Sequence, residues 1–311
     1  MSRLSRLAYC GLGKEATMGT PVVPTVFPPL TGNSPEDLTA PLRDESQRGN
    51  DARLQGLWPG VAESTYDHAG MVHLDSFGHY LRAIIGPDTV GAAVAGLSPH
   101  TFKGSNAQPP TYTLTGFNTL EARAFPGCML QDLNLKIDTK GAVTFDGKWN
   151  GWQSAPAATP VPPFTALTPL LGWQLTWSAG GAATTAVETV DLKWNRPIDI
   201  LAGSDGSQTP RESFGEDIAF TASGKMLFED NLTAQRFFTY AQAAAVATLT
   251  PPASLGGGSL QVTATKAVWH KFKVDVSGKY AVADFDLEGV YNTTDGGPAL
   301  VLLTGPQATA Y

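Results

Sequence analysis

This chain has little positive charge for its size. Its 311 residues include 21 Lys and Arg against 28 Asp and Glu, which gives a formal net charge of -7 at pH 7. A protein that binds nucleic acid by neutralising phosphates needs a surplus of Lys and Arg, so the composition disfavours that class. The balance still allows a surface past which DNA slides without being held.

Cysteine and long apolar segments are also scarce. Cys10 and Cys128 lie far apart and match no metal-ligand or redox spacing, so we expect two buried thiols in a reducing compartment rather than a disulfide. The sequence has no run of about eighteen apolar residues, and its amino terminus lacks the continuous apolar core of a signal peptide. We therefore expect a protein that is made and used without crossing a membrane by itself.

No residue set typical of a catalytic or metal site is present. Of the five histidines only His73 and His79 are close, and their spacing would not place them on one helix face as in H-E-x-x-H. The chain has no G-x-S-x-G elbow and no P-loop, and Gly11-Leu-Gly13 lacks the third glycine of a dinucleotide fingerprint. We expect no enzyme activity, no metal and no cofactor.

Glycine and proline, in contrast, are abundant. The 33 Gly and 23 Pro, with only 16% charged residues, favour a mainly β protein with long loops. Helical spacing of apolar residues predicts one helix from Phe77 to Ile85, ending near Gly86-Pro87, and a second over 231–245. Alternation predicts strands at 111–117, 133–137, 143–146, 173–177, 187–194, 259–269, 270–276 and 280–291, and a hairpin around Ser223-Gly224 made of 217–222 and 225–228.

Two parts of the sequence resemble each other. Gly70-Met-Val-His-Leu-Asp75 and Gly224-Lys-Met-Leu-Phe-Glu-Asp230 are each followed by a helix-like run and then by a strand pair with an Asp-x-x-Gly turn, at 138–141 and 275–278. Such self-similarity predicts two copies of one supersecondary unit, although short β hairpins can also resemble each other by chance.

A segment rich in Pro, Ala and Thr, 153–169, is the best boundary between two such units. We therefore expect a first module at 1–165 with an extended N-terminal arm, and a second module at 166–311.

Several motifs also resemble those of a known family, in the same order over nearly the whole chain. They are Gly13-Lys-Glu-Ala-Thr-Met-Gly-Thr-Pro21, Arg43-Asp-Glu-Ser-Gln-Arg-Gly49, the hairpin from Phe125-Pro-Gly-Cys128 to Gly141-Ala-Val-Thr-Phe145, and the closing segments Val290-Tyr291, Gly296-Gly297 and Leu300-Val-Leu-Leu-Thr304. Together and in this order they resemble the motifs of the tail tube proteins, or major tail proteins, of long-tailed, siphovirus-like bacteriophages.

This resemblance implies a β-sandwich or half-barrel module with a flanking helix, duplicated in this chain and assembled into stacked rings around a channel for the phage genome. Family modules are commonly about half this length and occur in sixfold rings, so two modules per chain imply a trimer with pseudo-sixfold symmetry. If the internal likeness is accidental, a hexamer of single-domain subunits is the alternative. The implied partners are further copies of the chain, a tape measure protein, a tail terminator and DNA in transient passage. The implied location is the virion tail, after synthesis in the host cytoplasm.

Acidic residues that could line such a channel lie on one strand. Asp284, Asp286 and Glu288 alternate with Phe285 and Leu287, as on a sheet with one wet and one packed side. Carboxylates repel phosphate and would leave DNA mobile. We predict that these three residues, together with Asp146 of the first module, face the channel; the alternative is that they face outer solvent.

Two further interpretations remain open. The irregular segments 13–56 and 153–169 are predicted to reach an adjacent ring, unless they are mobile surface loops. The chain could also be another virion β-module protein, from a baseplate or a capsid decoration, or a carbohydrate-binding β-sandwich in which tryptophans stack on sugars. The tryptophans form two close pairs, Trp149 with Trp152 and Trp173 with Trp177, and the second pair, at an even spacing on a predicted strand, is more simply part of a core.

Overall fold

The computed structural model describes residues 4–49, 51–163, 168–204, 206–229 and 232–311. It is mainly β, with 53% strand and 8% helix, which confirms the predicted fold class. The elements up to residue 165 are η1 (Ser5–Leu7), β1 (Tyr9–Lys14), β2 (Leu30–Thr39), β3 (Leu42–Asp44), β4 (Gly56–Trp58), β5 (Ala62–Met71), α1 (Phe77–Ile85), β6 (Asp88–Val90), β7 (Ser98–Phe102), β8 (Tyr112–Phe117), β9 (Ala122–Asp138), β10 (Thr144–Trp152) and β11 (Ala155–Ala157). Those after it are η2 (Gly172–Gln174), β12 (Leu175–Ala179), β13 (Ala182–Thr184), β14 (Val187–Asn195), β15 (Ile198–Ala202), β16 (Pro210–Gly215), β17 (Ala219–Leu227), α2 (Leu232–Thr239), β18 (Ala243–Leu249), η3 (Ala253–Leu255), β19 (Ser259–Asp275), β20 (Val282–Gly289) and β21 (Leu300–Gly305).

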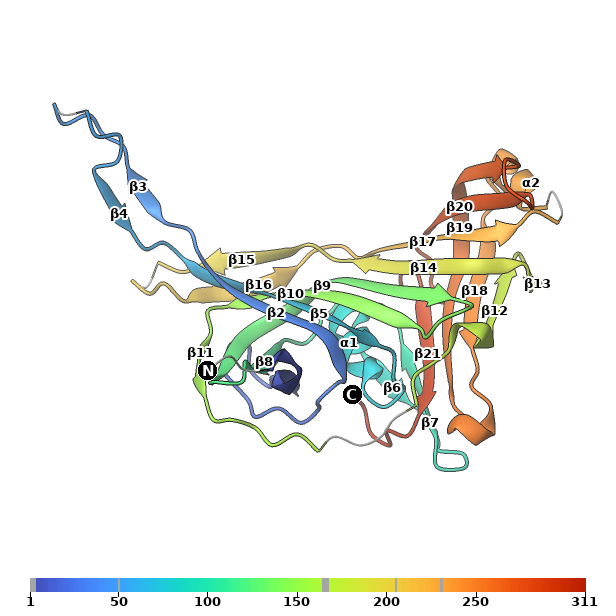
Figure 1. Cartoon of the computed structure of the whole chain (residues 1–311), viewed down its shortest axis with the longest axis horizontal. Coiled ribbons are helices and arrows are strands. Elements are labelled where there is room, and N and C mark those ends of the chain that lie inside the picture. The colour runs from blue at the N-terminus through green and yellow to red at the C-terminus, as the bar shows by residue number, and fades with distance from the viewer. Residues whose placement is uncertain (1–3, 50, 164–167, 205, 230–231) are drawn as a thin grey trace.

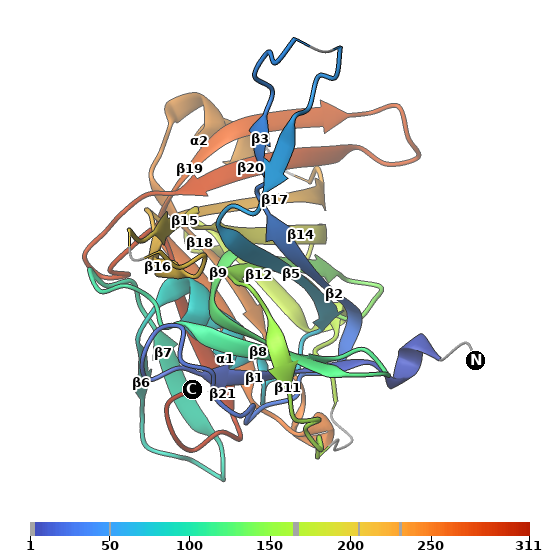
Figure 2. The same cartoon turned by 90° about the vertical axis from the view of Figure 1, so that its left-hand side faces the viewer.

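One long antiparallel sheet, which we call the main sheet, runs through the molecule (Figure 1). Its strands follow the order β2–β5–β10–β9–β14–β17–β20–β19. Figure 2 shows this succession, with β19 and β20 near the top and β5 and β2 lower down. The pair β9–β14 joins the first half of the chain to the second. The main sheet therefore has β2 as one edge and the C-terminal part of β19 as the other.

The two longest strands each take part in two groups of pairings. The C-terminal part of β9 lies between β10 and β14, whereas its N-terminal part pairs with β8 and β11. Pro126 and Gly127 form a bulge against β8 between these two parts. Gly127 has a φ of 63°, a conformation that glycine adopts without steric cost. Similarly, β19 pairs with β20 through its C-terminal part and with β18 and β21 through its N-terminal part.

Helix α1 packs against one face of the main sheet. It begins at Phe77 and ends at Ile85, before Gly86, as the sequence predicts. Nearly all of its residues are buried, and the ring of Tyr80 lies 4.6 Å from that of Phe145 and 5.8 Å from that of Trp149, both on β10. Alternate residues of the sheet strands point toward this core, which explains why their sequences alternate between apolar and polar.

The predicted N-terminal arm is shorter than expected. The sequence predicts an irregular segment over 13–56, but residues 30–39 form β2, and Val26 bridges to Leu12 of β1. Pro35 lies within β2, where proline is tolerated because an edge strand leaves backbone positions without a ladder partner. Among the described residues of this segment, the hairpin around β3 and β4, residues 40–49 and 51–61, projects from the body (Figure 1). We call it the projecting hairpin.

Three predictions for the second half are wrong in detail. The expected hairpin around Ser223-Gly224 is a single strand, β17, because Gly224 lies in the ladder under the ring of Phe285. The helix predicted over 231–245 ends at Thr239, and the following alanine-rich segment forms β18, in which buried positions alternate; Asn231 lies outside the described residues. The two strands predicted at 259–276 are one, β19, with a bulge at His270.

The two halves of the chain use the same set of strand pairings. The first contains β1–β8–β9–β10–β5–β2, and the second contains β12–β18–β19–β20–β17–β14. The first half has the short hairpin β3–β4 between β2 and β5, and the second half has β15–β16 between β14 and β17. Helix α1 follows β5, and helix α2 follows β17. The short strands β11 and β21 pair with β9 and β19 respectively. The registers agree as well: Gly70 pairs with Phe145, and Gly224 with Phe285.

Candidate functional site

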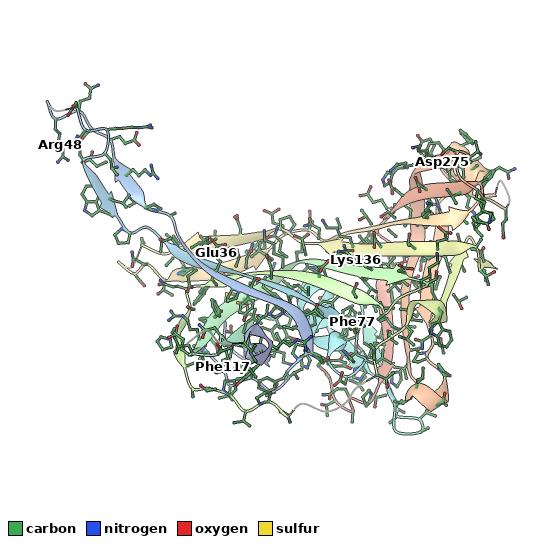
Figure 3. The ribbon with its side chains drawn as sticks, viewed as in Figure 1. Glu36, Arg48, Phe77, Phe117, Lys136 and Asp275 are labelled. Atoms are coloured by element: carbon green, nitrogen blue, oxygen red, sulfur yellow. The ribbon has the colours of Figure 1, made fainter. Side chains whose placement is uncertain are left out.

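The face of the main sheet opposite α1 is polar, and we call it the polar face. In Figure 3, Glu36 and Lys136 lie on this side and Phe77 lies beneath the sheet. Its charged side chains, taken from the alternate positions of the strands, are Glu36, Glu63, Asp67, Asp132, Asp138, Asp146, Asp191, Asp275, Asp284, Asp286 and Glu288, and Lys136, Lys148, Lys193, Lys225, Lys271 and Lys273. Eleven carboxylates against six ammonium groups give this face a formal charge of -5.

The four acidic residues singled out from the sequence all lie on the polar face. Asp284, Asp286 and Glu288 project from β20 between the buried Ala283, Phe285 and Leu287. Asp146 follows Phe145 on β10 as Asp286 follows Phe285 on β20, so the two occupy corresponding positions.

Lysines, which the sequence reasoning missed, accompany these carboxylates. Asp146 forms an ion pair with Lys136, and the carboxylate Oδ2 of Asp286 lies 3.1 Å from Nζ of Lys271. Asp284 stands in register between Lys225 of β17 and Lys273 of β19. The alternation of these lysines with buried apolar residues was the available signal. The polar face is therefore a mixed surface with an acidic excess rather than a uniformly acidic one.

Charges couple across the centre of the polar face, where β10, β9 and β14 meet. Partial burial raises the pKa of Asp191 above its ordinary value, while Lys136 opposes this shift and Asp146 adds to it. The hydrogen bond and charge of Asp146 raise the pKa of Lys136. These three residues come from three different strands, so the charge pattern depends on the register of the sheet.

Both edges of the main sheet are open. Residues 34–39 of β2 are exposed and pair only with β5 among the described strands. Residues 271–275 of β19 pair with β20 on one side, and the β18 ladder on the other side ends at Ala267. An open edge offers unpaired backbone groups to another chain. These edges are therefore the most direct sites for sheet extension.

The projecting hairpin exposes apolar side chains. Leu42, Leu57 and Trp58 are 63%, 57% and 52% exposed, and Leu42 pairs with Trp58 across the hairpin. Beyond them, the carboxylate of Asp44 accepts a hydrogen bond from the backbone N–H of Ser46 at 2.9 Å and forms an ion pair with Arg48. Exposed apolar residues on a projecting element are typical of a contact surface.

The Gly13–Pro21 motif has a structural explanation that centres on Glu15. This buried carboxylate accepts hydrogen bonds from the hydroxyls of Thr111 and Thr113, each at 2.7 Å, and from the backbone N–H groups of Gly19 and Gly127, at 2.8 and 2.9 Å. It therefore ties together the loop after β1, strand β8 and the bulge of β9. The motif thus maintains the fold and does not form a reactive site.

The histidines and cysteines named from the sequence are buried. His73 precedes α1 and His79 lies within it, and within the described part of the chain no three His, Cys, Asp or Glu side chains gather as a metal site requires. Cys10 and Cys128 are buried free thiols, as expected, and burial raises the pKa of Cys10 to about 12. In the described segments, no helix is both long enough and apolar enough to cross a membrane. Trp149, Trp152 and Trp177 are buried. Trp173, expected on a strand in the core, instead lies in η2 and is 60% exposed.

The fold and these surfaces define a β-rich protein with one extended polar sheet face and open sheet edges. A family model described as phage tail tube protein matches residues 3–307, nearly the whole chain. The chain therefore belongs to the phage tail tube protein family, whose members are structural components of the virion tail and assemble into a tube. A comparison with curated proteins gave no match.

Proposed function

We propose that this protein polymerises into stacked rings of three chains, which form the hollow tail tube of a long-tailed phage. The observation that carries this proposal is the repeated set of pairings in the two halves, joined through β9–β14. On this interpretation residues 1–165 and 166–311 are two modules of one kind. Three chains then supply six modules, a ring with pseudo-sixfold symmetry.

Ring closure has a physical cause. Among the described strands, β2 and the end of β19 each lack a partner on one side, and such edges favour association with other chains. When the last β19 meets the first β2, the sheet closes on itself and no edge remains, as in a barrel. A chain with two modules reaches closure with fewer encounters than a chain with one.

The polar face lines the channel in this assembly. Asp146, Asp284, Asp286 and Glu288 all lie on it, and its charge of -5 per chain disfavours lasting contacts with phosphate. The lysines lie among carboxylates, which limits their attraction for the DNA backbone. The channel therefore allows DNA to pass during ejection without being held.

Stacking of rings requires a contact that repeats without closing. The projecting hairpin, with Leu42, Leu57 and Trp58 exposed, is suited to reach the adjacent ring. The segment 153–169 has the same proposed role; its residues 164–167 lie outside the described part of the chain. The further partners are a tape measure protein inside the tube and a tail terminator at its end. The chain itself is synthesised in the host cytoplasm before it assembles.

Electron microscopy of the purified protein across a concentration series tests the assembly. We expect hollow tubes with three chains per ring. Rings of six chains would be consistent with a tail tube but would refute the two-module arrangement. Closed rings that never stack would favour a baseplate or capsid decoration role, and a persistent monomer would refute the tube. Trp149 and Trp152 are too buried to stack on a sugar, whereas Trp173 is exposed, and a glycan array provides the direct check.

Charge substitution tests the channel. Replacement of Asp284, Asp286 and Glu288 by Lys should slow DNA ejection from assembled particles because each Lys attracts phosphate. The neutral variant with Asn, Asn and Gln at these positions is the matched control and should have an intermediate effect. Normal ejection by tubes of the Lys variant would refute the lumen assignment.

A further inference from the structure

We propose that the contact which closes the ring copies the internal β9–β14 junction. In this contact, β2 of a second copy of the chain pairs antiparallel with the free part of β19, with Ser34 opposite Lys271 and Gly32 opposite Lys273. The proposal rests on the assembly described above and specifies the residues through which one copy recognises the next.

The internal junction provides the template. Asp191 of β14 stands opposite Lys136 of β9, and Lys193 stands opposite Asn134. Charges of opposite sign meet across the junction, since Nζ of Lys193 lies 3.6 Å from Oδ1 of Asp132. The amide of Asn195 also donates a hydrogen bond to the same oxygen at 2.7 Å. This contact is therefore a ladder reinforced by polar side chains on the polar face.

The register transfers through residues that occupy the same place in both halves. Gly70 and Gly224 each face a phenylalanine on the next strand: a Cβ on Gly70 would lie 3.0 Å from the ring of Phe145, and one on Gly224 would lie 2.8 Å from that of Phe285.

Counted from these two glycines, Asp67 of β5 and Thr221 of β17 occupy corresponding places. Ser34 pairs with Asp67 and Lys193 pairs with Thr221, so Ser34 corresponds to Lys193. Lys271 corresponds to Asn134, since they pair with Asp286 and Asp146 respectively. The pair Lys193–Asn134 within one chain thus becomes the pair Ser34–Lys271 between two chains.

The two free edges are complementary in charge. Lys271 and Lys273 project from the exposed edge of β19 on the polar face. Glu36 projects on the same face of β2, two residues from Ser34. Pairing in the proposed register places this carboxylate diagonally next to Lys271, while Lys273 lies on the far side, opposite Gly32. Every other described strand of the main sheet has partners on both sides, so β2 and β19 are the edges available for this pairing.

A second feature of the template is a segment that covers the tip of the β9–β10 hairpin. Leu170, which precedes η2 and β12, is 2% exposed. Its N–H donates to the carbonyl of Val72 at 2.9 Å, and its own carbonyl accepts from the N–H of Val143 at 2.8 Å. The N–H of Gly172 donates to the carbonyl of Gly141 at 2.8 Å. The segment before β12 thus packs as an extra layer on the hairpin.

The corresponding tip of the β19–β20 hairpin has no such cover among the described residues. Val276 and Tyr280 on it are 75% and 63% exposed. The segment before β1 contains a 3₁₀ turn, η1, just as η2 precedes β12, and it leads away from the body in Figure 2. Its Leu4 and Leu7 are 74% and 59% exposed. This segment of the second copy therefore covers the open tip.

Disulfide trapping tests the register. Residues directly opposite in an antiparallel ladder have Cα atoms about 4.5–5.5 Å apart, which is within the range of a disulfide. We expect Ser34→Cys protein mixed with Lys271→Cys protein to give a covalent dimer on oxidation, and the double variant to give a covalent trimer. The off-register combination of Ser34→Cys with Val276→Cys should cross-link at least tenfold more slowly.

An intrachain pair shows that the chemistry works on this sheet. The variant with Lys136→Cys and Asp191→Cys should form its disulfide in the monomer and in the tube. If rings form and the intrachain disulfide forms while Ser34→Cys and Lys271→Cys do not cross-link, the proposed register is refuted but the proposed tube function is not. If neither rings nor tubes form, the proposed function itself fails.

A second variant keeps the proposal testable if the cysteine proteins assemble poorly. Leu7→Asp should raise the protein concentration required for assembly about tenfold and leave the thermal unfolding of the monomer unchanged. Leu120→Asp, at an exposed leucine in the turn between β8 and β9, is the matched control. Assembly of the Leu7→Asp protein at the wild-type concentration would refute the role of the N-terminal segment.

Discussion

Replacement of Glu15 by Gln should destabilise the chain strongly, although Gln has nearly the same shape. Oε1 of Glu15 accepts from the Thr113 hydroxyl and the Gly127 N–H, and Oε2 accepts from the Thr111 hydroxyl and the Gly19 N–H. Gln turns one of these oxygens into an NH₂ donor. A threonine hydroxyl can rotate to accept from it, but a backbone N–H cannot, so either the buried N–H of Gly127 or the part-buried N–H of Gly19 loses its partner.

The magnitude follows from these four bonds. A buried donor left unpaired costs about 1–3 kcal/mol, and the bonds to the remaining oxygen each weaken by about 1 kcal/mol when the acceptor loses its charge. We expect the free energy of unfolding to fall by about 3–5 kcal/mol. Since 1 kcal/mol shifts the melting temperature of a large domain by about 2–4 °C, the midpoint should fall by about 10 °C.

The assay is denaturant unfolding followed by tryptophan fluorescence, at a protein concentration below that at which rings form. Glu121→Gln is the matched control because Glu121 is exposed and forms only a 3.7 Å ion pair with Arg123; it should change the unfolding free energy by less than about 0.5 kcal/mol. A Glu15→Gln protein within about 1 kcal/mol of wild type would show that the carboxylate does not hold the β9 bulge in place.

Three further predictions concern buried titratable groups. Burial lowers the pKa of His68 to about 3, and burial with nearby positive charge lowers that of His79 to about 4, so both histidines are neutral in the fold. The free energy of unfolding should therefore fall below pH 6.5, by up to about 2.7 kcal/mol per pH unit, because the unfolded chain binds the protons that the fold excludes. The His68→Gln variant should show a flatter pH profile. Cys10 and Cys128 should react with a thiol reagent at pH 8 only after denaturation, since burial raises both pKa values. His100→Phe should cost about 3 kcal/mol in thermal unfolding because it leaves the Asp88 carboxylate and the Gln307 carbonyl without the imidazole; wild-type stability would refute this.

Local patterns predicted the parts of the fold that depend on local chemistry. Apolar spacing and the Gly86 stop located α1, and alternation placed Asp284, Asp286 and Glu288 on one face of β20. Both signals come from residues whose burial follows the period of the element that contains them, every second residue in a strand and every third or fourth in a helix. Such residues can be identified without knowledge of what lies opposite them.

The parts that depend on distant partners could not be predicted. Pro35 and the charged residues around it do not suggest a strand, and β2 forms because β5 lies beside it. Ser223-Gly224 is typical of a turn, but Phe285 of β20 covers the glycine and keeps β17 straight. Alternation with apolar residues marks the lysines of the polar face as outward-facing, but only the sheet register brings Lys271 to Asp286.

Two modules in one chain would allow the two kinds of junction in a ring to differ chemically. At the internal junction Asp191 of β14 stands opposite Lys136 of β9, but near Asp132 the lysine lies on β14 and the aspartate on β9, as in Lys193–Asp132. At the corresponding end of the proposed junction between chains this second polarity is reversed, with Glu36 on β2 and Lys271 on β19. A β2 strand that met β9 would place Glu36 near Asp132 and repel it, so a wrong pairing is disfavoured by like charge as well as by lost contacts. Exchange of the lysine and the carboxylate with each other at one junction alone should therefore lower the yield of closed rings. The same exchange at both junctions should restore the yield.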